Sequence, residues 1–200
     1  MDTNLNEIIN IYSGEKVIAK HAPVKIIGLI VYTERDPFLI KCLRDEDYWK
    51  SLDLASGQKW IIFSVKPKPG SYETPKTPKG GFGFLVPIWK EPADNEKILN
   101  YLNIESTKDL PLLFVMHLNK AGEMLMSAIK IAGKTPEETY VNLQNLILEL
   151  TAVIERVKEE NYENSDAIFN LIKGKIESLI FFEKAKGNLN KWKEFKDIFL

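Results

Sequence analysis

The pattern of hydrophobic positions is clearest between Asp109 and Ala132. Two apolar runs, Leu112–Leu118 and Met124–Ile131, flank the polar turn at 119–122. Apolar runs of this length, bounded by turn residues, are typical of β-strands. We therefore predict a β-hairpin, preceded by Leu110-Pro111, around which the rest of the chain is organised.

The first half of the chain carries two further strand patterns. Val24–Thr33 is a nearly unbroken, mostly β-branched run, which predicts a strand buried on both faces of a sheet, and Lys59–Val65 predicts a second strand. Between them we expect one helix from Pro37 to about Leu54, because Asp36 is a favourable cap and proline fits a first helical turn. Ser56-Gly57 is its expected end.

Other segments have the three-to-four-residue spacing of amphipathic helices. The longest begins at Thr135-Pro136-Glu137-Glu138, a cap followed by a first-turn proline and the glutamate of a capping box, and extends to Val157. Asn164-Ser165-Asp166 opens another helix, interrupted near Gly187. Shorter helices are expected at Leu5–Tyr12, around Asn95–Leu102 and around Trp192, Phe195 and Phe199.

Lys66–Gly81 differs in composition from its surroundings. It contains four prolines and three glycines and little that would be buried, so we predict a loop without an element of its own. The apolar run that follows, Phe82–Trp89, is expected to fold back on the core or to extend the sheet, with Pro87 favouring an edge position.

The order of these elements resembles the core of a thioredoxin-like domain over approximately Val24–Val157. The closest likeness lies in LPLLFVMHLNKAGEMLMSAIKIAGKTPEETYVNLQNLI, where a proline opens a strand, a hairpin follows, and a glycine precedes a closing helix. The resemblance implies an α/β fold with a central mixed sheet in the order β-α-β-α-β-β-α. We accordingly divide the chain into an N-terminal helical segment (1–23), a thioredoxin-like domain with a Pro/Lys/Gly-rich loop at 66–81 (24–158), and a C-terminal helical extension (159–200).

The resemblance also implies a position for an active site. In that family the proline corresponding to Pro111 forms a cis peptide facing a Cys-x-x-Cys motif at the start of the first helix. The equivalent segment here, Thr33–Phe38, contains no cysteine. Cys42 would lie one to two turns into the helix and is expected to fill core space. We therefore expect a redox-inactive protein, because dithiol exchange needs an activated thiolate at the helix N-terminus.

Composition excludes several classes of function. A content of 44% hydrophobic residues in 200 is enough for a real core, and 27 basic against 28 acidic residues give a net charge of −1, which argues against a nucleic-acid or anionic-membrane partner. One cysteine excludes an internal disulfide and a Cys-rich zinc site, and His21 and His117 are too few for a histidine metal centre.

The N-terminus lacks the pattern of a secretory signal, and no run is long enough to span a membrane, so we expect a cytoplasmic protein. Few arginines beside abundant Lys, Ile and Asn hint at an AT-rich bacterial genome.

The candidate ligand or partner cleft lies where the first strand ends, since α/β folds bind ligands at the carboxyl ends of parallel strands. Its residues are Thr33, Glu34, Arg35, Asp36 and Pro37, together with Pro111. The alternative is a capping aspartate flanked by solvated charges. No catalytic, cofactor or metal-ligating residues are predicted.

Three other patterns favour structural interpretations. Asp45-Glu46-Asp47 point in different directions on a helix and make a poor metal cage, and Gly80–Phe84 lacks the spacing of a phosphate loop. His117 is interpreted as structural. Lysines 66, 68, 76 and 79 make the long loop basic, which suits either an acidic partner or a solvated loop.

The C-terminal aromatic residues form a candidate partner surface. Trp192, Phe195 and Phe199, with Phe181 and Phe182, make the segment more apolar than a free tail requires. Three roles are open for these aromatic residues: packing on the domain itself, binding a protein partner, or forming a homodimer.

Our leading hypothesis is a non-catalytic thioredoxin-like protein-binding or assembly module that acts through its C-terminal helices. The alternative is an enzyme or small-anion-binding protein that uses the cleft at the start of the first helix, near Pro111. A third hypothesis, nucleic-acid binding through the 66–79 loop, predicts strongly salt-dependent affinity.

Overall fold

The computed structural model describes residues 24–65, 71–73, 88–90, 99–100, 102–104, 109–119, 121 and 123–181. Several predicted features lie outside the described residues. They are the helix at Leu5–Tyr12, most of the helix around Asn95–Leu102, the lysines and the glycine run of the long loop, and the aromatic residues Trp192, Phe195 and Phe199.

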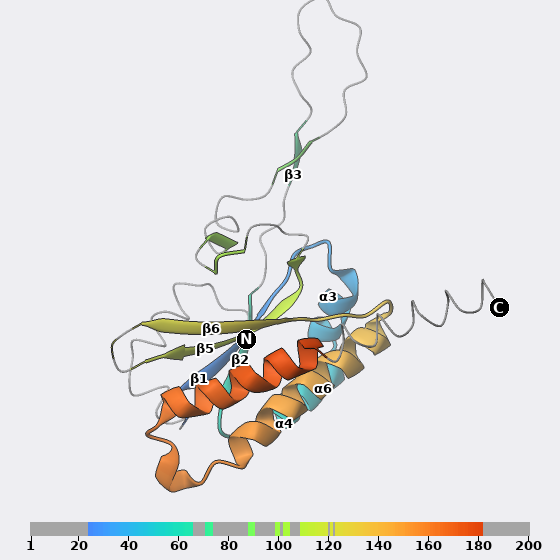
Figure 1. Ribbon diagram of the computed structural model, residues 1–200. Coiled ribbons are helices and arrows are strands. Elements are labelled where there is room, and N and C mark those ends of the chain that lie inside the picture. Colours follow the sequence, from blue (N-terminus) through green and yellow to red (C-terminus); the bar gives the residue numbers. More distant parts are fainter. Residues whose placement is uncertain are drawn as a thin grey trace, which may run out of the picture.

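A four-stranded mixed sheet forms the centre of the fold (Figure 1). Its strands are β1 (Ile26–Val31), β2 (Ile61–Val65), β5 (Leu112–Leu118) and β6 (Met124–Lys130), in the order β2-β1-β5-β6. β1 runs parallel to β2 and antiparallel to β5, and β6 runs antiparallel to β5. The expected α/β fold with a mixed sheet and a central hairpin is therefore confirmed.

Alternation along the strands divides the apolar side chains between two cores. Ile26 and Ile30 of β1 belong to the core on the helical side, whereas Ile27, Leu29 and Val31 belong to the core on the opposite face. All six residues of β1 are buried. This confirms the prediction that the first strand is buried on both faces.

Helices cover one face of the sheet (Figure 1). They are α3 (Pro37–Arg44), α4 (Glu46–Ser56), α6 (Pro136–Glu155) and a helix over 165–181, and all four contribute to the same core as the sheet. A short 3₁₀ helix, η2 (Glu159–Asn161), lies between the last two. Of the described helices, none is both long enough and apolar enough to cross a membrane.

The single helix predicted from Pro37 to Leu54 is wrong, because the chain breaks it at Asp45. The backbone of Asp45 is extended (φ −77°, ψ 121°), and its carboxylate accepts hydrogen bonds from the backbone N–H groups of Asp47 and Tyr48 at 3.1 and 3.2 Å. Asp45 thus caps a second helix instead of continuing the first, as short polar side chains tend to do. The predicted end is confirmed, with Gly57 at φ 67° after α4.

The predicted start of α6 is confirmed with one change. Thr135 Oγ1 accepts a hydrogen bond from the Glu138 N–H at 3.1 Å. The Glu138 carboxylate accepts from the N–H of Lys134 at 2.9 Å, one residue before the cap, where a capping box would use the cap residue itself.

The prediction of an element-free loop at 66–81 is wrong at 71–73. β3 (Ser71–Glu73) pairs antiparallel with β4 (Ile88–Lys90) in a separate two-stranded sheet. The described end of the Phe82–Trp89 run therefore does not extend the main sheet. Three-residue strands held by main-chain hydrogen bonds need no apolar run, so periodicity does not reveal them.

Candidate functional site

The turn between β1 and α3 satisfies its own polar groups. Asp36 Oδ2 accepts hydrogen bonds from the Thr33 N–H at 2.7 Å and the Thr33 hydroxyl at 3.1 Å, and Thr33 Oγ1 accepts from the Arg35 N–H at 3.2 Å. Asp36 stands at the cap position of α3, but its side chain makes no cap bond to the helix. The expectation that the Asp36 carboxylate caps α3 is wrong, because the carboxylate accepts hydrogen bonds from Thr33 instead of from the first N–H groups of the helix.

Pro111 lies at the same end of the sheet as this turn. β1 and β5 pair in a register that sets Val31 opposite Leu112, so the next residues on the two strands are Tyr32 and Pro111. The Leu110–Pro111 peptide is cis, as the resemblance implied. Thr33 is buried, Pro111 is half-buried, and Glu34 and Arg35 are exposed.

The only cysteine of the chain is inert in this fold. Cys42 is fully buried in α3, where its Sγ–H donates to the Pro136 carbonyl oxygen at 3.0 Å. Burial raises the pKa of the Cys42 thiol, which opposes formation of the nucleophilic thiolate. The expectation that Cys42 fills core space is confirmed.

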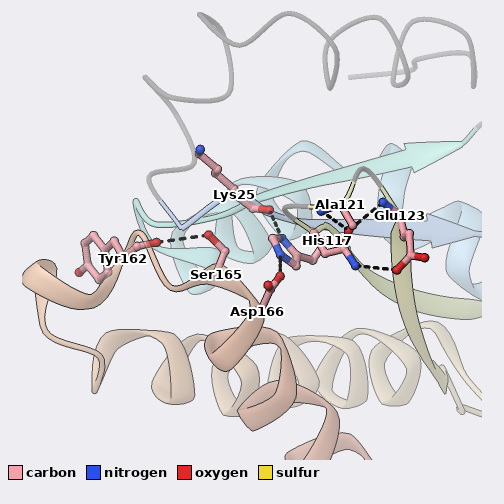
Figure 2. A network of polar contacts seen from close by, with 8 residues as sticks. Lys25, His117, Ala121, Glu123, Tyr162, Ser165 and Asp166 are labelled. Carbon is pink, nitrogen blue, oxygen red and sulfur yellow. Dashed lines mark hydrogen bonds and ion pairs between the residues drawn. The ribbon is translucent and has the colours of Figure 1, made fainter.

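A buried histidine and a carboxylate connect β5 to the 165–181 helix (Figure 2). His117 Nε2 lies 2.7 Å from Asp166 Oδ1, and its Nδ1 lies 3.2 Å from the backbone carbonyl oxygen of Lys25. The His117 residue is 2% exposed and its ring is tilted against that of Phe169, with centroids 6.1 Å apart. Since both ring nitrogens are engaged inside the fold, His117 has no free nitrogen for a substrate and acts as an internal tether.

The groups around this tether do not form a catalytic triad. The Ser165 hydroxyl, one residue before Asp166, donates to the Tyr162 carbonyl oxygen at 3.3 Å and is buried (Figure 2). The nearby hairpin turn is closed by Asn119, whose Oδ1 accepts from the N–H groups of Ala121 and Glu123 at 3.0 and 2.8 Å. These bonds order the turn and the helix start.

The His117–Asp166 pair is the feature that sequence reasoning missed. His117 shares strand parity with Leu113 and Val115, which belong to the core on the helical side, so the parity indicated the layer in which a partner would lie. Strand parity did not indicate which acidic residue would be the partner of His117, because Asp166 lies 49 positions away in the sequence.

A second buried polar network joins α4 to α6. Trp60 Nε1 donates to Thr151 Oγ1 at 3.0 Å, and the Thr151 hydroxyl donates to the Ala55 carbonyl oxygen at 2.9 Å. Every buried side-chain nitrogen or oxygen in the described part of the chain has a hydrogen-bond partner. In the same part, no three His, Cys, Asp or Glu side chains cluster as metal ligands would.

The face of the sheet away from the helices is hollowed beside β5 and β6. A cavity of about 460 Å³ is lined mainly by apolar side chains, with Asn103, Asp109 and Ser127 as its polar groups. Among the described residues, its lining includes none of Thr33–Pro37 and contains no thiol, histidine or lysine. Asp109 is the one carboxylate and Ser127 the one hydroxyl among the described residues of the lining.

The helical layer carries large apolar side chains on its outward side. Leu171 of the 165–181 helix is 57% exposed, Phe181 is 69% exposed, and Val141 and Leu148 of α6 are each 47% exposed. The two helices lie side by side (Figure 1), bridged by Lys175 Nζ and Glu149 Oε2 at 2.7 Å. Sequence reasoning had singled out only Phe181 of these residues.

Comparisons of the chain with protein-family models, with curated proteins and with solved structures gave no match.

Proposed function

We propose that the chain is a non-catalytic module with a thioredoxin-like core that binds protein through the outward side of its helical layer. The order β2-β1-β5-β6, with a parallel pair followed by an antiparallel hairpin and a closing helix, supports this proposal, because it agrees with the element order on which the resemblance rests.

The observation that carries the non-catalytic part is the inert turn at the end of β1. Thr33 and Asp36 satisfy each other there, and the one thiol of the chain is buried in α3 beneath a carbonyl oxygen. Nothing at this position replaces the dithiol as a nucleophile.

An anion-binding site at the start of α3 is the weaker alternative. Pro37 removes one of the N–H donors that an anion would use, and the Asp36 carboxylate already accepts from the Thr33 N–H beside it. An anion bound at the start of α3 would be repelled by the negative charge of the Asp36 carboxylate.

The binding part is supported by the exposed leucines of α6 and the 165–181 helix. Large apolar side chains that face water on adjacent helices are a common feature of protein interaction surfaces. The matching test captures proteins from a cell extract on the immobilised full chain and on its Leu171→Asp variant, with Lys50→Asp as a control for added charge.

Proteins retained by the wild type and by Lys50→Asp, but lost from Leu171→Asp, are the expected result. Identical protein sets on all three chains would contradict binding through this layer. A dithiol-dependent disulfide reductase activity of the wild type, abolished by Cys42→Ala, would contradict the non-catalytic part.

A further inference from the structure

The His117 ring lies between two hydrogen-bond acceptors (Figure 2). Nε2 lies 2.7 Å from Asp166 Oδ1, and Nδ1 lies 3.2 Å from the Lys25 carbonyl oxygen. A carbonyl oxygen has no proton to donate, and neither has an ionised carboxylate. A neutral imidazole carries one N–H, so it can satisfy only one of these two oxygens. The two contacts therefore require one proton more than a neutral ring and an ionised carboxylate hold together.

The surroundings of Asp166 suit a negative charge. Its side chain is 39% exposed to water, and the residue lies in the first turn of the 165–181 helix, where the helix dipole favours an anion. The His117 side chain is 3% exposed, and the carboxylate at 2.7 Å supplies the counter-charge that a buried cation needs. The additional proton thus belongs on the ring, which then donates from both nitrogens.

The backbone of Lys25 supports a donor at Nδ1. Lys25 has φ 53°, in the left-handed region that a lysine rarely adopts, and its carbonyl oxygen points at the ring (Figure 2). A ring nitrogen without a proton would repel this oxygen through its lone pair. An N–H at Nδ1 instead makes an attractive contact, which offsets the cost of the left-handed conformation.

No other described side chain brings a charge to the ring. The neighbours of His117 on β1, β6 and the helix are apolar: Ile26, Leu125 and Phe169. The ammonium of Lys25 points away from the ring (Figure 2). In the hairpin turn, the Glu123 carboxylate accepts from the Asn119 amide at 2.9 Å. Among the residues that the structure describes, Asp166 is thus the one carboxylate that holds the second proton on the ring.

We propose that His117 and Asp166 form a pH-operated latch between β5 and the 165–181 helix. While the ring carries both protons, it holds the helix through a charge-assisted bond and the start of β1 through the Lys25 carbonyl. As the pH rises, the ring releases the Nδ1 proton to solvent, because the charged Asp166 oxygen retains the proton on Nε2. The bond to Asp166 then loses its positive partner, and Nδ1 faces the Lys25 oxygen without a donor. Both contacts weaken together, which loosens the first turn of the helix. This inference does not depend on the proposed function.

Nuclear magnetic resonance of the ring nitrogens in the full chain tests the proton count. His21→Gln leaves His117 as the one histidine, so the ring signals of an isotope-labelled chain belong to it. At about pH 7 both nitrogens should have the chemical shift of a protonated ring nitrogen. One protonated and one bare nitrogen would overturn the inference.

Asp166→Asn removes the need for the second proton. The asparagine amide can donate its own N–H to a bare Nε2, while the Nδ1–H still reaches the Lys25 oxygen. The ring of this variant should therefore be neutral at about pH 7. A doubly protonated ring in Asp166→Asn would contradict the role of the carboxylate. The measurement on His21→Gln keeps the pair intact, so it stands whether or not Asp166→Asn folds.

Amide hydrogen exchange reports whether the latch opens. The N–H groups of Ala167 and Ile168 donate to the Asn164 carbonyl oxygen in the first turn of the helix. Their protection, corrected for the intrinsic effect of pH, should fall about tenfold or more once the ring loses its second proton. In His117→Gln, whose amide donates to Asp166 without titrating, protection should stay constant over the same pH range. Equal protection of both amides before and after the wild-type ring loses the proton would overturn the latch.

Discussion

Removal of the Asp166 carboxylate should loosen the attachment of the 165–181 helix to the sheet. In Asp166→Ala, His117 Nε2 loses its partner at 2.7 Å while the histidine remains 2% exposed. A buried polar group left without a partner costs about 1–3 kcal/mol. The Asp166 side chain is 39% exposed, so water replaces part of the bond, and we take about 2 kcal/mol.

The assay is thermal and urea unfolding followed by circular dichroism. For a chain of this size each kcal/mol lowers the melting temperature by about 2–4 °C, so Asp166→Ala should melt about 4–8 °C below the wild type. Asp166→Asn keeps an oxygen acceptor but removes the charge from the helix start, and should lose roughly half as much. Glu163→Ala removes an exposed carboxylate nearby and is the matched control.

A double-mutant cycle with His117→Ala separates the pair from other roles of either residue. We expect a coupling free energy of about 1 kcal/mol or more between the two sites. Equal melting temperatures for Asp166→Ala and Glu163→Ala, or additive effects in the cycle, would refute the tether.

Three further outcomes follow from the described contacts. Asp45→Ala should destabilise the chain by about 1 kcal/mol in urea, because α4 loses its cap, whereas the exposed Asp53→Ala should change little. Thr151→Val should cost about 1–3 kcal/mol in the same assay, since Trp60 Nε1 loses its acceptor, and a neutral result would contradict the role of this network. Burial raises the pKa of the Cys42 thiol in the folded chain above its ordinary value of 9.0. The protonated thiol therefore contributes its full stabilisation below pH 9.0, and this stabilisation is lost as the pH rises through the raised pKa of the folded chain. Urea unfolding at about pH 8 and about pH 10 should therefore show a larger alkaline loss for the wild type than for Cys42→Ala, and parallel losses would contradict it.

Patterns with a local physical cause were predictable from the sequence. The hairpin strands Leu112–Leu118 and Met124–Lys130 agree with the apolar runs almost residue for residue, because a run of that length between turn residues has few other solutions. The cap at Thr135 and the end at Gly57 follow from the same short-range chemistry.

Competition between short polar side chains was not predictable. Asp36 and Asp45 both precede helical patterns, yet Asp45 caps a helix and Asp36 bonds back to Thr33. Either arrangement satisfies a carboxylate, and only the path of the surrounding backbone decides between them. The split between α3 and α4 followed from that choice.

Long-range pairs were out of reach for a different reason. The hydrogen bonds from His117 to Asp166 and from Trp60 to Thr151 join residues 49 and 91 positions apart. Strand parity and helix periodicity indicate which face a residue occupies, but several acceptors share each face.

Site-specific photo-cross-linking tests most directly whether the helical layer binds protein. A benzophenone amino acid replaces Leu171, which is 57% exposed, and Lys50 on α4 serves as the control position, with a side chain 64% exposed. Illumination in living cells should give a covalent adduct at position 171 and none at position 50, and an adduct of twice the chain's mass would identify a second copy as the partner. Absence of any adduct at position 171, from cells that contain the folded chain, would contradict binding through this layer.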